Sequence, residues 1–313
     1  MTQYIAKMPR VTICIPVFNH EQFVTESINS VIAQDYENIE LIIIDDCSSD
    51  ASSNMIERLL SVCEKRFARF EYRKHNINKG LCVTLNEALE WSAGEYFSPI
   101  ASDDALLKNK ISGLLPYIHG KPGIAAVFGG VEFIDANGLN SGRRWQKKHI
   151  YKFEDIVLLA FPCAPGALIR VKDMKKAGGY YPGLLIEDWY MWLKLTESGS
   201  VLVSVPLLVA KYRLHETNIT KNLKKIHDGR LAVLEHFKYH PLYEKAISRA
   251  FTNSAHQLAN HDFFAAMKML KKATKENILK KYKEVVFALA MAVKRITVKL
   301  YNDLGRWLSK LKW

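Results

Sequence analysis

Three pairs of neighbouring carboxylates are the residues of this sequence best suited to chemistry. They are Asp45-Asp46, Asp103-Asp104 and Glu187-Asp188. Paired carboxylates can bind a divalent cation that shares its coordination with substrate phosphates, or they can handle protons. A helix cap or a turn explains any one pair taken alone. Three independent caps explain the whole set poorly, so the sequence predicts a shared acidic site.

Short β-branched runs alternate with amphipathic segments in the first half of the chain, a pattern typical of an α/β sheet with parallel strands. Strands are predicted at 11–15, 41–44, 69–73 and 95–98, and helices at 21–34, 51–65 and 79–92. The second strand leads directly into Asp45, and the fourth leads into Asp103. Ligands of open parallel sheets bind at the carboxyl ends of the strands. We therefore expect the carboxylates to meet at that edge.

The pattern changes beyond residue 120. Strands are predicted at 124–133, 167–170, 201–205 and 208–213, a turn at Asn137-Gly138, a polar basic loop at 141–148 and a helix at 187–198. Trp145 in the basic loop is expected to be exposed. From about Lys224 onward every segment reads as helix. The prediction is an α/β domain over residues 1–222 followed by a helical region over residues 223–313.

The composition and the lack of long apolar runs argue against a disordered, a secreted and a membrane-spanning protein. The 313 residues are 49% hydrophobic and 24% charged, as in a globular protein. The five cysteines show no Cys-x-x-Cys spacing and indicate reduced cytosolic thiols. Residues 1–10 lack the apolar stretch of a secretion signal, and the longest apolar run, 285–293, is shorter than the roughly 20 residues of a spanning helix. We expect a cytoplasmic protein that is soluble or peripheral at the inner face of the membrane.

The order and spacing of several motifs resemble glycosyltransferase family 2 over roughly residues 10–220. The motifs are Ile13-Cys14-Ile15-Pro16-Val17-Phe18-Asn19-His20-Glu21, Ile44-Asp45-Asp46-Cys47-Ser48-Ser49-Asp50, Ser102-Asp103-Asp104, Pro165-Gly166-Ala167, Glu187-Asp188-Trp189 and Tyr212-Arg213-Leu214-His215. The resemblance implies a GT-A fold, which is Rossmann-like with a mostly parallel central sheet. It also implies inverting transfer of a sugar from a nucleotide-diphospho-sugar donor to a hydroxyl of a glycan or lipid-linked glycan, assisted by Mn²⁺ or Mg²⁺. Members of this type build bacterial surface polysaccharides.

The resemblance also assigns residues to the donor site. Pro16, Phe18 and Glu21 would line the nucleotide pocket, and Asp46 would accept a hydrogen bond from the base. Lys79, near the mouth of the third strand, is a candidate for the phosphate site, although a solvated surface cation is the simpler interpretation.

The remaining roles concern the metal and the reaction. Asp103 would face the ribose and the metal region, and Asp104 would bind the metal. His215 would approach the metal or the diphosphate, with a purely structural histidine as the alternative. Asp188 would be the general base, its basicity raised by Glu187 and the Trp189 environment. Helix N-terminal charge is the alternative for that pair.

Other functions are less consistent with the sequence. No Gly-x-Gly-x-x-Gly follows the first strand and no P-loop is present, which argues against an NAD oxidoreductase and a P-loop nucleotidase. The Gln-x-x-Arg-Trp of processive synthases is missing, which favours single-sugar addition. A non-catalytic, membrane-associated scaffold with a degenerate transferase fold stays the alternative, and the intact acidic pairs argue against it. Cys47 stands where the family usually has glycine.

The C-terminal tail carries most of the net charge of +12. Residues 268–313 hold 13 Lys or Arg and three Asp or Glu. From Leu289 the apolar residues recur every three or four positions, and tryptophans stand at 307 and 313. This pattern predicts an amphipathic helix on an anionic membrane surface, with packing against protein as the alternative. The aromatic residues lie on the apolar stripe, so no nucleic-acid partner is expected.

Overall fold

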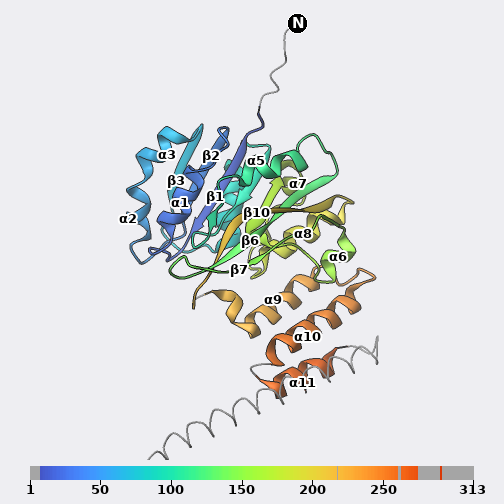
Figure 1. Ribbon diagram of the computed structural model, residues 1–313. Coiled ribbons are helices and arrows are strands. Elements are labelled where there is room, and N and C mark those ends of the chain that lie inside the picture. The colour runs from blue at the N-terminus through green and yellow to red at the C-terminus, as the bar shows by residue number, and fades with distance from the viewer. Residues whose placement is uncertain (1–7, 217, 260–261, 274–289, 291–313) are drawn as a thin grey trace, which may run out of the picture. The chain divides into compact units, whose positions relative to one another are not determined.

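The computed structural model in Figure 1 describes residues 8–216, 218–259, 262–273 and 290. The chain forms two compact units. The first comprises residues 1–156 and 160–218, and the second comprises residues 157–159 and 219–313.

The first unit is built on one sheet. Its strands are β1 (Val11–Val17), β2 (Ile39–Asp45), β3 (Arg69–Lys74), β4 (Tyr96–Pro99), β5 (Ala105–Leu106), β6 (Ile124–Asp135), β7 (Asn140–Arg144), β8 (His149–Tyr151), β9 (Ala167–Arg170) and β10 (Val201–Leu214). They are ordered β3-β2-β1-β4-β9-β6-β10-β5, with β7 paired to β6 and β8 paired to β10. The strands β3, β2, β1, β4, β6 and β10 all run in one direction, and β5, β7, β8 and β9 run against them.

Helices connect and cover these strands (Figure 1). They are α1 (Val24–Ile32), α2 (Ser52–Glu57), α3 (Leu60–Arg66), α4 (Leu81–Trp91), α5 (Lys110–Leu114), α6 (Phe153–Val157), α7 (Val171–Lys176) and α8 (Glu187–Glu197), with the 3₁₀ turns η1 (Leu115–Tyr117) and η2 (Ala164–Gly166). The strands β1 and β2 are buried over nearly their whole length, as their continuous apolar sequences dictate. Their side chains join those of α1 and α5 in the main hydrophobic core.

The predicted elements of the first unit are present, with three differences. The helix predicted at 51–65 is divided into α2 and α3 at Arg58 and Leu59. The first half of the predicted basic loop forms β7, because it pairs with β6 across the turn at Gly138. The two strands predicted on either side of Pro206 form one strand, β10, whose register against β6 shifts between Ser204 and Leu208.

The described part of the second unit is helical, as predicted. It contains η3 (Ile219–Lys221), α9 (Leu223–Glu235), α10 (Tyr243–Ala259) and α11 (Phe263–Lys272). The side chains of Asn222 and Asp262 cap α9 and α11. The helices α10 and α11 share a small core of alanines and Leu270. The helix predicted from Leu289 lies outside the described residues, apart from Ala290.

No helix in the described residues is both long and apolar enough to span a bilayer.

The common direction of the main strands decides where the functional residues lie. The strands β1, β2, β4 and β10 end at Val17, Asp45, Pro99 and Leu214. Because they are parallel, these four ends and the loops that follow them lie at the same edge of the sheet. His20, Asp46, Asp103 and His215 all belong to those loops.

Candidate functional site

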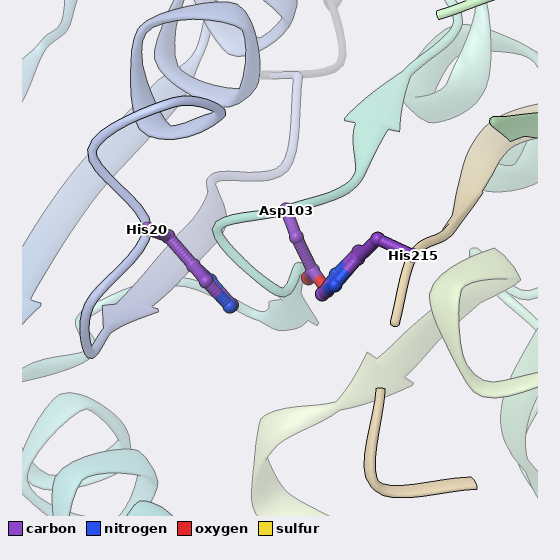
Figure 2. Close-up of side chains that lie close together, drawn as sticks. All are labelled: His20, Asp103 and His215. Carbon is purple, nitrogen blue, oxygen red and sulfur yellow. The ribbon is translucent and has the colours of Figure 1, made fainter. Parts of the chain in front are cut away.

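Three potential metal ligands meet at the carboxyl edge of the sheet. His20 follows β1, Asp103 follows β4, and His215 follows β10. Each offers one ligand atom, and the three atoms lie within 4.8 Å of one another. Figure 2 shows the Asp103 carboxylate meeting the His215 ring, with the His20 ring reaching toward the same point. The Nε2 atom of His215 is 2.8 Å from Oδ2 of Asp103.

Neighbouring side chains hold these three groups in position. The Nδ1 atom of His20 is hydrogen bonded to Ser102 Oγ at 2.8 Å, and burial lowers the pKa of His20. Asn218 accepts a hydrogen bond of 2.6 Å from the backbone N–H of His215, and its amide nitrogen lies 3.5 Å from Asp103 Oδ2. Such supporting contacts are typical of metal sites because they fix the ring orientation. A neutral imidazole is the form that binds a metal.

Arg213 ties the loop after β4 to β10. Its backbone N–H donates to Asp104 Oδ1 at 2.8 Å, and its Nε donates to the Asp103 carbonyl oxygen at 2.8 Å. The same buried guanidinium reaches the Asp135 carbonyl oxygen at 3.1 Å and the Glu26 carboxylate. Arg213, two positions before His215, therefore holds the backbone of Asp103 and the side chain of Asp104.

Asp104, the predicted metal ligand, does not join the group of His20, Asp103 and His215. Its Oδ1 accepts from the Arg213 backbone, and the side chain is buried. Burial, and secondly the charge of Asp103, raises the pKa of Asp104 well above its usual value. The fully buried Lys110, whose pKa burial lowers to about 7, donates to the Pro165 carbonyl oxygen at 2.9 Å. The structure thus brings Asp103, and not Asp104, to His215.

Asp46 organises the loop after β3. Its Oδ1 accepts from the backbone N–H of Lys79 at 2.7 Å and lies 2.7 Å from His75 Nδ1, and its Oδ2 accepts from Gly80 N–H at 2.8 Å. The Lys79 ammonium is paired with Glu87 at 2.7 Å. Both residues predicted for the donor site therefore have local structural partners.

The other predicted nucleotide-binding residues lie on or just after β1. Pro16 is half-buried opposite Ile44 of β2. Phe18 is 48% exposed, so its ring is available for stacking. The carboxylate of Glu21 accepts from the backbone N–H of Ala51 at 2.8 Å and joins the loop after β1 to the loop after β2.

Cys47 has a left-handed backbone conformation, with φ of 65°. Its position follows the Asp45-Asp46 pair, where the family motif usually has glycine. A side chain is costly in this conformation. Hydrogen bonds around the position hold it: the Asp45 carboxylate accepts from Ser48 N–H at 2.9 Å, and Asn19 accepts from Ser49 N–H at 2.8 Å.

Glu187 and Asp188 form the first turn of α8, with Asp188 accepting from Trp189 N–H at 2.6 Å. The buried Trp189 anchors this turn by donating its indole N–H to the Ile156 carbonyl oxygen at 2.8 Å. Burial raises the pKa of Asp188. Burial, and then the charge of Asp188, raises the pKa of Glu187 to about 8. Both carboxyl groups are therefore harder to ionise than exposed ones, and Glu187, with a pKa of about 8, keeps its proton at neutral pH.

Cys163 links the two acidic regions. The pKa of its thiol is raised to about 11, mainly by burial; the charge of Arg144 opposes this rise, and the charges of Asp104 and Asp188 add to it. The carboxylates of Asp104 and Asp188 therefore act on one side chain, although 84 positions separate them in the sequence.

The family described as Glycosyl transferase family 2 matches residues 12–178. The chain belongs to this family. It is therefore a glycosyltransferase, and the family predicted from its motifs is confirmed.

Two relatives illustrate the similarity. The chain is 28% identical over 234 residues to UDP-Glc:alpha-D-GlcNAc-diphosphoundecaprenol beta-1,3-glucosyltransferase WfgD from Escherichia coli. The match covers 74% of this chain and 88% of WfgD. It is 30% identical over 246 residues to an uncharacterized glycosyltransferase from Rickettsia conorii, where the match covers 75% of this chain and 39% of the relative.

Solved structures confirm the predicted GT-A fold. TarS from S. aureus, in complex with UDP-GlcNAc, superposes with a TM-score of 0.63 at 14% identity, covering 95% of this chain and 92% of TarS. The mannosyltransferase PcManGT from Pyrobaculum calidifontis, in complex with GDP-Man and Mn²⁺, superposes with a TM-score of 0.59 at 14% identity, covering 93% and 88%.

Several residues of this glycosyltransferase site received no role from the sequence. They are His20, His75, Arg213 and Asn218. The one available signal was position, because His20 follows a strand and Arg213 ends one. Their partners are distant in the sequence, so no local pattern could reveal the contacts.

Proposed function

We propose that this chain transfers one sugar from a nucleotide-diphospho sugar to a hydroxyl of a glycan or lipid-linked glycan, with inversion at the anomeric carbon. The observation that carries the proposal is the convergence of His20, Asp103 and His215 at the carboxyl edge of a GT-A sheet. A metal there would lie where open parallel sheets bind their ligands.

The donor atoms of this group fit a divalent transition metal. One carboxylate and two imidazoles suit Mn²⁺ better than Mg²⁺, which prefers oxygen ligands. Asp103, His215 and His20 would hold the ion, and a bound ion would neutralise the charge that develops on the leaving diphosphate. Asp103 would then have the ligand role that the family resemblance implied for Asp104. Arg213 and Asn218 would keep its carboxylate aimed at the ion.

The nucleotide would occupy the loops after β1, β2 and β3. The exposed ring of Phe18 offers a stacking surface beside Pro16. Asp46 would face the base from a loop that its own hydrogen bonds keep rigid. Glu21 would support the same pocket through its contact with Ala51. Lys79 would reach the phosphates only by leaving Glu87.

Asp188 would act as the general base. The acceptor oxygen attacks the anomeric carbon as the bond from that carbon to the diphosphate oxygen breaks, and Asp188 takes the hydroxyl proton. Its raised pKa makes it a stronger base than an exposed aspartate, and protonated Glu187 keeps a second negative charge away. Attack from the face opposite the leaving group inverts the configuration.

The acceptor is proposed to be a lipid-linked glycan diphosphate used in bacterial polysaccharide assembly. WfgD, which matches most of this chain, is named for an acceptor of that type. The basic tail from Leu289 would hold the enzyme at the cytoplasmic face of an anionic membrane. Truncation after residue 284 should then abolish sedimentation with anionic vesicles, whereas unchanged sedimentation would remove this part of the proposal.

Donor binding provides the direct test. Calorimetric titration of UDP and of GDP should give binding with Mn²⁺ and none with EDTA, and a panel of nucleotide sugars should then identify the sugar from product formation. Asp103→Asn should lose the metal-dependent binding. Asp228→Asn, which changes an exposed carboxylate on α9, should keep it. Metal-independent binding of both nucleotides by the native chain would contradict the metal-assisted mechanism.

A further inference from the structure

A strongly basic segment with an exposed tryptophan lies on the first unit. It is the last part of the loop predicted at 141–148. Its residues 143–148, here called the basic loop, have the sequence Arg143-Arg144-Trp145-Gln146-Lys147-Lys148. Its four cationic side chains are exposed, and Trp145 is 58% exposed. The donor site and the reaction described above use none of these residues.

The sheet holds the basic loop at both ends. In β7, Arg144 pairs with Val131 of β6, and in β8, His149 pairs with Ser204 of β10. The hydroxyl of Ser204 also donates to the Lys147 carbonyl oxygen. Gln146 is buried between the exposed residues. The loop therefore presents its cations from a fixed backbone, which lowers the entropy lost on binding.

The charges of the basic loop are mostly uncompensated. Arg143 forms an ion pair with Glu132 at 3.1 Å. Within the described ranges of the chain, no carboxylate lies within ion-pairing distance of Arg144, Lys147 or Lys148. Arg143 and Arg144 are successive residues of a strand, so they project to opposite faces. Arg144 is thus the strand arginine that is free to meet an anion.

Backbone contacts bring the basic loop and the turn before β9 against the same strand, β6. A Cβ atom at Gly130 would lie 2.6 Å from the Arg144 carbonyl oxygen, and one at Gly166 would lie 2.5 Å from the Gly129 carbonyl oxygen. The loop and the Pro165-Gly166 turn therefore approach two successive residues of β6. The Cys163 thiol, beside that turn, is influenced by the charges of both Arg144 and Asp188.

We propose that Arg144, Lys147 and Lys148 bind the diphosphate of a lipid-linked acceptor, and that Trp145 contacts the adjoining lipid. This inference rests on the proposed function, because it names the acceptor site of that reaction. The planar guanidinium of Arg144 can donate two hydrogen bonds to one phosphate, while the lysines supply point charges to the other.

The apolar side chains around the loop support a lipid-borne anion over a soluble one. Besides Trp145, Ile150 of β8, two residues after the loop, is 55% exposed. Tryptophan next to cationic side chains is typical of surfaces that sit at a membrane interface. Binding of a soluble phosphate would require only the cationic side chains and would not explain the exposed Trp145 and Ile150.

The test is the binding of farnesyl diphosphate to the full-length protein by calorimetry in EDTA, so that no metal or donor takes part. Arg144→Gln should weaken binding by about tenfold or more, and the triple change Arg144→Gln/Lys147→Gln/Lys148→Gln should abolish it. Two control variants should bind farnesyl diphosphate within about twofold of wild type. The double change Arg143→Gln/Glu132→Gln removes the neighbouring arginine at constant net charge. Lys176→Gln removes an exposed cation on α7.

Farnesol and inorganic pyrophosphate separate the two halves of the ligand, and both should bind more weakly than farnesyl diphosphate. Equal affinity of wild type and Arg144→Gln for farnesyl diphosphate would overturn the proposal. The proposal would also be overturned if the loop variants still bound farnesyl diphosphate but no longer bound vesicles of phosphatidylglycerol. The loop would then be a general membrane-binding surface. If the triple variant does not fold, the single changes at the exposed Lys147 and Lys148 give the same test. If the wild-type protein bound neither UDP nor GDP in the presence of metal, the proposed function would be refuted. The farnesyl diphosphate titration is made in EDTA, so its result would still be interpretable.

Discussion

The Nε2 atom of His215 lies 2.8 Å from the Oδ2 atom of Asp103, although 112 positions separate the two residues. Two strands that are not adjacent in the sheet, β4 and β10, end at the same edge and bring the two residues together. A separation of this size between a carboxylate oxygen and an imidazole nitrogen is also that of two ligands on one cation, each about 2.1 Å from it. The contact therefore supports the proposal that Asp103, and not Asp104, is the carboxylate that would bind a metal.

Substitution at the two neighbouring aspartates should separate their roles. Asp103→Asn removes a charged ligand and should abolish binding of Mn²⁺, measured by electron paramagnetic resonance of the free ion and by the loss of thermal stabilisation. Asp104→Asn keeps an acceptor for the Arg213 N–H, so Mn²⁺ affinity should change by less than about threefold. His20→Gln should weaken binding by about tenfold. If Asp104→Asn loses the metal and Asp103→Asn keeps it, the assignment is reversed.

The pair Glu187 and Asp188 should give an asymmetric response. Asp188→Asn removes the base and should lower kcat by about 100-fold or more while leaving Mn²⁺-dependent nucleotide binding intact. Glu187→Gln imitates the protonated side chain present at pH 7, so kcat at that pH should fall by less than about threefold. Turnover measured with a saturating donor checks both. Near-normal turnover of Asp188→Asn would place the base elsewhere.

The same pair predicts the dependence on pH. Because the pKa of Asp188 is raised, turnover should fall as the pH drops through that value, above the range of an ordinary aspartate. Glu187 binds its proton more tightly in the folded state, so its contribution to the free energy of unfolding is greatest below about pH 4.5 and is lost as the pH rises to about 8. Denaturant unfolding from pH 5 to 8 should therefore show a steeper loss of stability for wild type than for Glu187→Gln. Parallel curves for the two proteins would contradict this.

Arg213→Gln should affect both stability and metal binding. The change leaves the carbonyl oxygens of Asp103 and Asp135 without their donor, which should lower the free energy of unfolding by about 2–4 kcal/mol. It also frees the loop that carries Asp103, so Mn²⁺ affinity should fall. Urea unfolding and metal titration measure the two effects. Arg213→Lys should not restore affinity, since an ammonium cannot span these partners. Full rescue by lysine would indicate a role of charge alone.

The conformation of Cys47 gives a prediction confined to stability. Cys47→Gly places glycine at φ of 65° and should change the free energy of unfolding by less than about 1 kcal/mol, with activity kept. Cys47→Val puts a β-branched side chain there and should destabilise the protein by about 1–3 kcal/mol. Urea unfolding of the two variants provides the comparison. A Val variant as stable as the Gly variant would show that the loop can adopt another backbone conformation.

Local sequence determined the elements of this protein and the edge at which its site forms. The apolar runs of β1 and β2 could only be buried strands, and their direct continuation into Phe18 and Asp46 placed predicted donor-site residues at strand ends. The motif order was sufficient for the family, and Glu187-Asp188 was found at the start of a helix as predicted.

Tertiary structure decided which residues touch. Position in the sequence does not distinguish Asp103 from Asp104, because neighbouring side chains differ only in the direction they take from the turn. The Asp103 carboxylate meets His215 and Asn218, whereas the buried Asp104 carboxylate accepts from the Arg213 backbone. These partners lie more than 100 positions away. The basic residues 143–148 were visible in the sequence, but only the pairing of β7 with β6 placed their backbone against Gly130. Contacts between distant segments depend on the order of strands in the sheet, and no local pattern of residues encodes that order.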